Sequence, residues 1–285
     1  MNERNKGIFY MILASLFFAL MATAVKYSGD LPTIEKVFFR NIVGFIYVAF
    51  LIKKSGESFK GTNTRYLIYR SFLGLMGVFL YFFAIDRLPL ADAVVLNQTN
   101  PFFVMLLASI FLGERIKKVQ ILLFILALTG VGFIVKPQFD YRVVPALAGL
   151  SSALFAASAY TIIRHLRTTD HPNVIVFYFT GLSTITALPF LLFGQFVFPT
   201  PLQLLVLLSV GVFATIAQLL MTYAYRYAEA GDLSIYSYGQ TVFSIFIGIV
   251  IFFEIPDIYS FLGISLIIFS AYLNYRIKRR ATEID

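Results

Sequence analysis

The sequence predicts an all-α integral membrane protein in which ten transmembrane helices form two five-helix repeats of opposite orientation. Its 285 residues are 59% hydrophobic and 13% charged, and so few polar residues could not cover the surface of a water-soluble fold. Apolar runs of about 20 residues, the length that an α-helix needs to cross a bilayer, recur along the whole chain. The second half of the sequence also repeats the pattern of the first half.

Ten apolar runs have the required length, and the connections between them are too short for a soluble domain. The first run also fits a cleavable signal peptide, since Arg4 and Lys6 precede its apolar stretch and "ATA" (22–24) follows. The internal repeat argues against cleavage, because this run has a counterpart in the second half. The ten predicted spans are residues 7–26, 34–52, 66–86, 91–112, 119–136, 144–164, 174–193, 202–226, 231–253 and 257–276.

An internal repeat divides the chain into residues 1–137 and 138–285, with five spans in each part. "ASLFFALMATAVK" (14–26) aligns with "SALFAASAYTIIR" (152–164), and the later spans align without a gap at a spacing of 140 residues. Because five is odd, the second copy must cross the membrane in the opposite direction to the first. Inverted repeats of this kind are typical of secondary transporters, whose solute site lies near the bilayer midplane. Residues that match at this spacing include Ala84 and Ala224, Glu114 and Glu254, and Lys136 and Arg276.

Positive charge is concentrated in alternate loops. With the N-terminus inside, sixteen of the 23 Lys and Arg residues lie in cytoplasmic segments and five lie on the other side. This bias predicts that both termini are cytoplasmic, and we expect the chain to lie in a prokaryotic cytoplasmic membrane. Because the net charge of +8 is distributed over short loops, we expect no nucleic-acid partner.

A polar cluster interrupts the fourth span at "NQTNP" (97–101). Pro101 has no backbone N–H, and its ring crowds the preceding turn, so the carbonyl of Asn97 loses its helical partner. A bare carbonyl is costly in lipid, which confines this face to protein or to a wet cavity. The counterpart in the ninth span is "SYGQT" (237–241), where Gly239 is a second weak point.

Both halves therefore break their apolar pattern at corresponding positions, which is the best indication that a sequence gives of a transporter's binding site. The alternative is a packing kink whose polar side chains bridge neighbouring helices. We predict that Pro101 and Gly239 have a structural or gating role and that the polar residues contact solute. The predicted solute contacts at the two breaks are Asn97, Gln98, Asn100, Tyr238 and Gln240.

Further candidates lie at similar depths in other spans. Tyr81, Gln218 and Tyr223 are predicted to line the same pocket, although packing is the usual role of an aromatic residue in lipid. Arg40 lies six residues into the second span, where a functional role and a side chain that reaches back to the interface are both open. Arg70, near the start of the third span, is assigned to the cytoplasmic interface.

No acidic residue lies deep within a predicted span, because each lies either at the end of a span or outside the spans. Glu114 and Glu254 recur at the close of spans four and nine, which indicates partners for backbone or basic groups at a tight turn, with a structural or gating role. No carboxylate lies at mid-membrane, and this favours neutral, zwitterionic or anionic cargo over a cation exporter. Capture of an amine by aromatic faces stays open.

The stretch from Leu73 to Pro137 resembles the second part of an EamA repeat, the unit of the drug/metabolite transporter superfamily. It has a Gly-rich third span, an "LPLADA" turn, a proline in the fourth span and an "LGER" exit. The second half departs from this pattern, with "FFEIP" (252–256) in place of "LGER" and Thr241 in place of proline. The resemblance implies ten helices around a central cavity, with the fifth and tenth spans peripheral and available for homodimer contacts.

From this resemblance we expect a secondary transporter that moves a small polar or zwitterionic metabolite by alternating access. The solute would be amino-acid-like or nucleoside-derived, and "ADAVVLNQTNPFFVMLLA" is similar to the branch that includes S-adenosylmethionine uptake proteins. Coupling to a proton or to a counter-substrate stays open, as does export of drugs or organic amines. No GxxxxGK[ST] motif for a nucleotide-driven motor occurs.

An enzyme is the main rival class. "HLRTTD" (165–170) has the HxxxxD spacing of glycerolipid acyltransferases, but it occupies a short basic loop with no domain around it. The chain has no cysteine and only two histidines, so we predict no metal site and no cofactor. A channel is disfavoured too. Channels usually need oligomeric rings or a selectivity filter, and neither is visible in an inverted pair of five-helix repeats. We therefore expect a carrier rather than an enzyme.

Overall fold

The computed structural model describes residues 3–112, 118–135, 143–166, 168–228 and 230–282, and all regular structure within them is helical. The predicted spans are confirmed, but the fourth and the ninth are each divided into two helices. The elements are α1 (Glu3–Tyr27), α2 (Thr33–Ser55), α3 (Thr64–Ile85), α4 (Leu90–Asn97), α5 (Asn100–Leu112), α6 (Lys118–Val135), α7 (Val143–Leu166), α8 (Pro172–Phe190), the π-helical turn η1 (Leu191–Gln195), α9 (Pro201–Tyr227), α10 (Ala230–Ser237), α11 (Gly239–Phe252) and α12 (Ile258–Thr282).

Most of these segments can cross a membrane by length and composition. Within the described ranges, eight are long and apolar enough, and α6 is a shorter apolar helix. The tenth segment, α2, contains charged residues at both ends and Arg40 inside the helix. The chain is therefore a multi-pass membrane protein, and α2 differs from the other helices in the charge that it contains.

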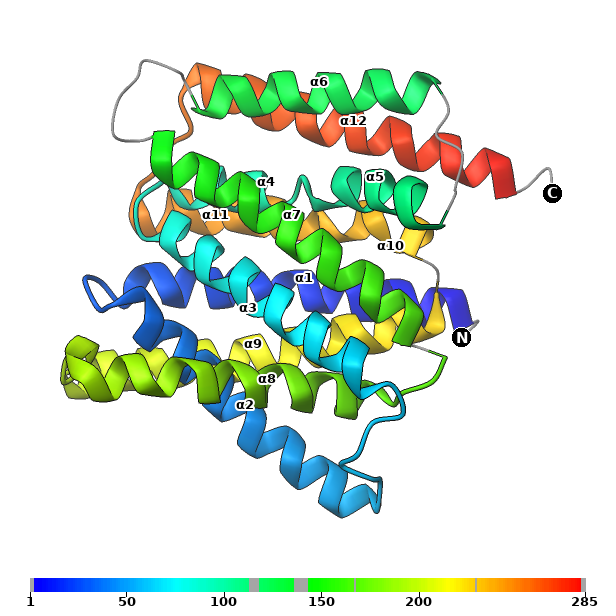
Figure 1. Ribbon diagram of the computed structural model, residues 1–285. Coiled ribbons are helices and arrows are strands. Elements are labelled where there is room, and N and C mark those ends of the chain that lie inside the picture. Colours follow the sequence, from blue (N-terminus) through cyan, green and yellow to red (C-terminus); the bar gives the residue numbers. More distant parts are fainter. Residues whose placement is uncertain (1–2, 113–117, 136–142, 167, 229, 283–285) are drawn as a thin grey trace.

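The helices pack as an inverted pair of repeats. Corresponding helices such as α1 and α7 run in opposite directions, and the helix bundle begins and ends on the same side (Figure 1). The most extensive helix pairs join one repeat to the other, namely α1 with α9, α3 with α7, α2 with α8, and α6 with α12. If each helix is replaced by its counterpart in the other repeat, the pair α1 and α9 becomes α7 and α3. The pairs α2 with α8 and α6 with α12 stay the same. The core is therefore shared between the repeats.

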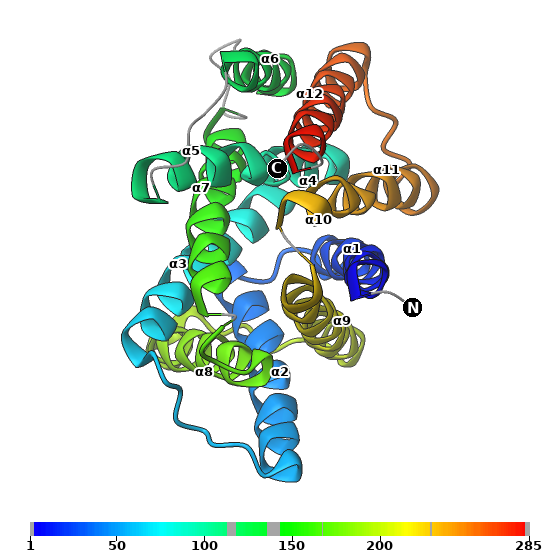
Figure 2. The same cartoon turned by 90° about the vertical axis from the view of Figure 1, so that its right-hand side faces the viewer.

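The pair α6 and α12 lies at one edge of the bundle (Figure 2). The two backbones approach closely at Gly130 and Gly263, where a Cβ atom on Gly130 would lie 2.8 Å from the carbonyl oxygen of Gly263. Small residues at such a crossing are the usual way in which membrane helices come into contact. Gly132, two residues further along α6, has no atom within 4 Å of its Cβ position.

Replacing Gly130 with alanine is expected to lower the free energy of unfolding by about 1–3 kcal/mol, the usual cost of overpacking a close contact. The matched variant Gly132→Ala should be neutral or slightly stabilising, because the added methyl group meets no neighbour. Thermal unfolding of the purified proteins, followed by far-UV circular dichroism, measures both effects. Equal melting temperatures for the two variants would contradict the close approach of α6 and α12.

Candidate functional site

The break in the fourth span is satisfied by its own side chains. Gln98 and Thr99 separate α4 from α5. The Asn97 carbonyl, which Pro101 leaves without a helical partner, accepts a hydrogen bond of 2.9 Å from Nδ2 of Asn100. The Thr99 hydroxyl donates to the carbonyl of Leu96 at 2.7 Å. The amide at position 100 thus has the local role of replacing the missing backbone bond.

The break in the ninth span is satisfied by the other repeat. Tyr238 separates α10 from α11. The carbonyl oxygen of Ser237 accepts a 2.6 Å hydrogen bond from Nε2 of Gln98 and a 3.3 Å bond from the hydroxyl of Ser15 on α1. The break in the ninth span therefore depends on a side chain of the break in the fourth span, Gln98, and on α1.

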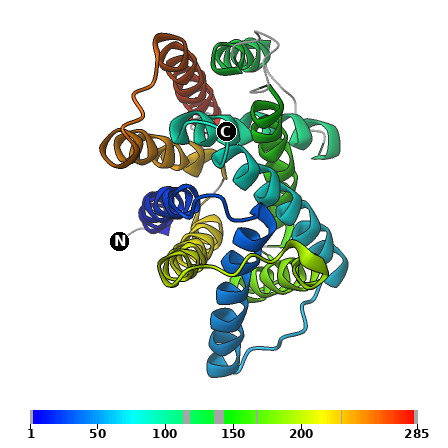
Figure 3. The same cartoon turned by 90° about the vertical axis from the view of Figure 1, so that its left-hand side faces the viewer.

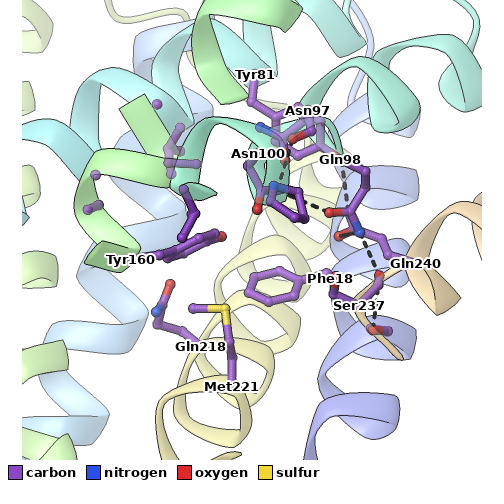
Figure 4. Close-up of a pocket in the computed structure, with 18 of the residues that line it drawn as sticks. Phe18, Tyr81, Asn97, Gln98, Asn100, Tyr160, Gln218, Met221, Ser237 and Gln240 are labelled. Carbon is purple, nitrogen blue, oxygen red and sulfur yellow. Dashed lines mark hydrogen bonds between the residues drawn. The ribbon is translucent and has the colours of Figure 1, made fainter. Parts of the chain in front are cut away.

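Amide side chains connect the two breaks into one network. Nε2 of Gln240 donates to the Tyr81 hydroxyl at 3.0 Å, and Oε1 of Gln240 accepts from Gln98 at 3.4 Å. Nδ2 of Asn100 donates to Oε1 of Gln98 at 3.2 Å, and Asn97 donates to the hydroxyl of Ser152 at 2.8 Å. Figure 4 shows these amides grouped on one side of the site.

A cavity lies between the repeats beside this network. Its volume is about 120 Å³, which is enough for a small solute or several waters. Tyr160, Gln218 and Met221 face the amide group across it (Figure 4). The two repeats contribute equivalent positions to its wall. The matched lining residues are Phe18 and Ala156, Met21 and Ala159, Val78 and Gln218, Tyr81 and Met221, Asn97 and Ser237, and Asn100 and Gln240.

The cavity reaches the end of the bundle where α1 begins and α12 ends. Its lining includes Arg164 and Tyr225, each third from the end of its helix, and Arg70, in the second turn of α3. No lining residue among the described ranges comes from the last turn of α1 or the first turn of α4, which lie at the opposite end. The cavity therefore extends to the end of the bundle where α1 begins, and it is closed at the opposite end.

Two ion pairs close the opposite end, which faces the viewer in Figure 3. Lys26, near the end of α1, pairs with Glu254, whose other oxygen accepts a 2.8 Å bond from the backbone N–H of Leu90 at the start of α4. Lys36 pairs with Asp86 at 2.7 Å and also donates to the carbonyl of Gly29 at 2.7 Å. Glu254 therefore lies at a tight turn beside a basic group and a backbone N–H, as the sequence predicts.

This closure is modest in strength. The pKa of Asp86 is raised above its ordinary value, because the effect of burial outweighs the opposite effect of the neighbouring Lys36. The carboxylate is thus partly desolvated, and desolvation offsets much of the Coulomb attraction in a pair of this kind.

Two arginines lie inside the cavity wall rather than at a membrane interface. Arg40 is 3% exposed and Arg70 is 2% exposed, and both line the cavity. The interface position assigned to Arg70 from the sequence is therefore wrong, because the cavity extends to the second turn of α3. Both guanidinium groups contact the ring of Phe179, with Cζ 3.9 Å from the ring centroid for Arg70 and 5.1 Å for Arg40.

Most of the predicted contacts line the cavity, and two tyrosines do not. Tyr223 faces the start of α8, where its hydroxyl donates to Oδ1 of Asn173 at 3.3 Å. Tyr238 is 4% exposed in the hydrophobic core, with no hydrogen-bond partner for its hydroxyl among the described residues. The predicted residues that do line the cavity are Arg40, Tyr81, Asn97, Gln98, Asn100, Pro101, Gln218 and Gln240.

Of the two remaining candidates, Gly239 does not line the cavity, and the position of Glu114 is not described. Gly239 begins α11, and a Cβ atom there would meet Ser15 at 3.4 Å, so the position packs against α1. Glu114 lies outside the described residues.

Reasoning from sequence missed several wall residues. Phe179 and Tyr225 are aromatic residues among 32 Phe and 17 Tyr, and nothing distinguishes them before the helices are placed. Phe18 and Met221 could have been found, because each is the repeat partner of another wall position. Arg70 also had a signal, since it is one of only two Lys or Arg residues that lie more than three residues from either end of a predicted span.

The HxxxxD motif does not form an acyltransferase pair. Asp170 accepts hydrogen bonds from the backbone N–H of Thr62 at 2.6 Å and from the hydroxyl of Thr169 at 2.8 Å, which fixes the loop between α2 and α3. The His165 ring packs against Tyr66, with 4.8 Å between ring centroids. The two side chains thus have separate structural surroundings.

Comparison with known proteins identifies the relatives of this chain. Residues 5–136 and 144–276 each match the EamA-like transporter family. The chain is 35% identical over 278 residues to the pseudopaline exporter CntI of Pseudomonas aeruginosa, covering 96% of this chain and 98% of that protein. It is 26% identical over 267 residues to the riboflavin transporter of Rhizobium johnstonii, covering 92% and 88%.

More distant matches agree in kind. Human solute carrier family 35 member G1 is 26% identical over 267 residues, covering 88% of this chain and 73% of that protein. A solved crystal structure superposes with a TM-score of 0.73 over 97% of this chain and 99% of that chain, at 19% identity, which supports the fold alone. The named relatives are transporters rather than enzymes, and the prediction of a transporter instead of an acyltransferase is confirmed.

Proposed function

The chain belongs to the EamA-like transporter family, and on that premise we propose that it is a secondary transporter working by alternating access on a small polar or zwitterionic metabolite. The observation that carries this proposal is a polar cavity between two broken helices, one from each inverted repeat. The cavity reaches one end of the bundle and is closed at the other. Inverted repeats allow the same site to open on the other side when one half rocks against the other.

We assign the end of the bundle that the cavity reaches to the cytoplasmic side of the membrane. Described basic residues such as Arg4, Lys53 and Arg65 lie at that end, in the arrangement that the positive-inside bias favours. The structure then corresponds to an inward-facing state with both termini cytoplasmic. Coupling to a proton or counter-substrate, and homodimer contacts through α6 and α12, stay predictions.

The chemistry of the wall favours polar over cationic cargo. The relatives are named for different substrates, so the cavity itself has to indicate the solute class. Other rings, such as Tyr160, line the cavity, but an organic amine bound among them would meet the like charge of Arg40 and Arg70, which contact the ring of Phe179. Amides that both donate and accept, as at Gln98 and Gln240, suit amino, hydroxyl and carboxylate groups.

Counterflow in proteoliposomes tests the carrier mechanism. Vesicles loaded with an unlabelled solute should take up the labelled solute faster than empty vesicles. The binding site of a carrier takes an unlabelled molecule out of the loaded vesicle and returns with a labelled one. A thermal-shift screen against metabolites supplies the solute, since a ligand that binds the folded state raises its apparent stability. Uptake that is equally fast in loaded and empty vesicles would indicate a channel and contradict the proposal.

A further inference from the structure

The cavity wall contains two buried arginines without a carboxylate beside them in the described part of the chain. Arg40 and Arg70 are nine-tenths or more buried, and both line the space. Among the described residues that line the cavity there is no aspartate or glutamate. A buried guanidinium is normally paired with a carboxylate, because leaving water without such a partner is costly. The ring of Phe179 contacts both groups, but it does not supply the negative charge that would offset their burial.

The hydrogen-bonding capacity of these groups is also largely unused. Nη1 of Arg40 donates to Oδ1 of Asn41 at 2.8 Å, whereas its Nε has no partner in the described part of the chain. Arg70 makes no hydrogen bond to any residue that the structure describes, and its Nε and Nη1 are buried without partners. Nε2 of Gln218, on the same cavity, is a further buried donor without a partner. All the unpaired buried polar atoms of the described wall are donors, so the groups that could pair with them are acceptors on a bound solute.

The geometry points to an anion subsite formed by Arg40 and Arg70, which takes a carboxylate or phosphate group of the transported solute. This inference rests on the proposed function and narrows its substrate class to organic anions and zwitterions with an oxyanion group. A guanidinium presents a planar fork of donors that matches carboxylate and phosphate oxygens. Phe179 holds both forks at the cavity by its ring face, and the amides of the two breaks remain for the polar remainder of the solute. A purely structural pair would instead serve only to hold α2 and α3 against α8.

Thermal unfolding of the full-length protein in detergent, at constant ionic strength, separates these two roles. The probes are succinate for a carboxylate, glycerol 3-phosphate for a phosphate, alanine for a neutral zwitterion and choline for a cation. Succinate or glycerol 3-phosphate should raise the melting temperature of the native protein, and the stronger of the two identifies the oxyanion. In Arg40→Met and Arg70→Met the apparent affinity for that anion should fall about tenfold or more.

The probe-free protein gives a second readout that does not depend on the solute. Arg70→Met replaces an unpaired buried cation with an apolar chain of similar length, so its melting temperature without anion should equal or exceed that of the native protein. Arg87→Met is the matched control: Arg87 also contacts a phenylalanine, with Cζ 3.7 Å from the Phe83 centroid, but it is exposed and lies outside the cavity. It should keep the full response to anion.

Several results would overturn the subsite. They are no stabilisation of the native protein by either anion, an anion response that survives in both arginine variants, or stabilisation by choline in place of the anions. Counterflow separates this failure from failure of the carrier proposal. Exchange of alanine at the native rate in Arg40→Met and Arg70→Met would leave a carrier without an anion subsite, whereas no exchange of any probe by the native protein would reject the carrier as well.

Discussion

Replacing Gln240 with alanine is expected to lower the initial rate of solute exchange by about tenfold or more. The side chain donates to Tyr81 and accepts from Gln98, so its loss removes the donor to the buried Tyr81 hydroxyl and one of the two acceptors of Gln98 Nε2, and it breaks a link between the two repeats. Each unpaired buried group costs about 1–3 kcal/mol, and 1.4 kcal/mol corresponds to a factor of ten. The solute loses a wall contact in addition. Counterflow in proteoliposomes, normalised to the amount of inserted protein, measures the rate.

Tyr238→Phe is the matched control for this variant. Tyr238 lies two residues earlier at the same break and is equally buried, but its hydroxyl has no partner among the described residues and does not line the cavity. Removing that hydroxyl should leave both exchange and stability unchanged or slightly improved. If Gln240→Ala exchanged solute at the native rate, the amides would be packing groups only, and the break would lose its proposed role.

Glu254→Gln is expected to open the closed end of the cavity. The substitution removes the charge that pairs with Lys26 and weakens the acceptor for the N–H of Leu90, so α1, α4 and the turn after α11 lose a common contact. A loss of about 1–2 kcal/mol from a partly buried pair would raise the population open on that side roughly 5- to 30-fold. The readout is labelling of a single thiol at Ala156→Cys by a membrane-impermeant reagent added on the closed side. The natural sequence contains no cysteine, so no other thiol reacts.

The matching substitution at the other end is Glu57→Gln. The Glu57 carboxylate lies 3.0 Å from Nδ1 of His171, and the two side chains are exposed to a degree similar to that of Lys26 and Glu254. The cavity already reaches this end, so labelling from the closed side should stay at the native level. An equal increase in labelling for both variants would show that the ion pairs act through general stability rather than through closure.

The fold was largely predictable, because the signals that specify it are local or periodic. The lengths of the apolar runs predicted the spans, and the fixed spacing between pairs such as Glu114 and Glu254 predicted the repeat. The odd number of spans in each repeat then predicted its inversion. Pro101 predicted a break by the loss of one backbone bond, and the structure shows that Asn100 replaces this bond. Chemistry confined to a few neighbouring residues can be predicted from sequence in this way.

The candidate site was predictable only where the repeat constrained it. The rotation of a helix that is apolar on most sides depends on its neighbours, so the sequence could not distinguish Tyr223 from Tyr225 on α9. In the packed structure, Tyr225 lines the cavity, whereas Tyr223 reaches Asn173 at the start of α8. Arg70 was misplaced for a related reason: depth along a span says nothing about how far a cavity extends, and here the cavity reaches the second turn of α3.

Two-sided labelling of Ala156→Cys, in a chain that is otherwise native, tests the central claim most directly. Ala156 lines the cavity between the repeats, and its thiol can be probed in sealed vesicles of either orientation. In the absence of solute, the account predicts fast reaction from the side of the termini and slow reaction from the other side. An exchangeable solute should slow the first reaction, because it occupies the site. Equally fast reaction from both sides at once would indicate an open pore, and no protection by any transported solute would place the site elsewhere.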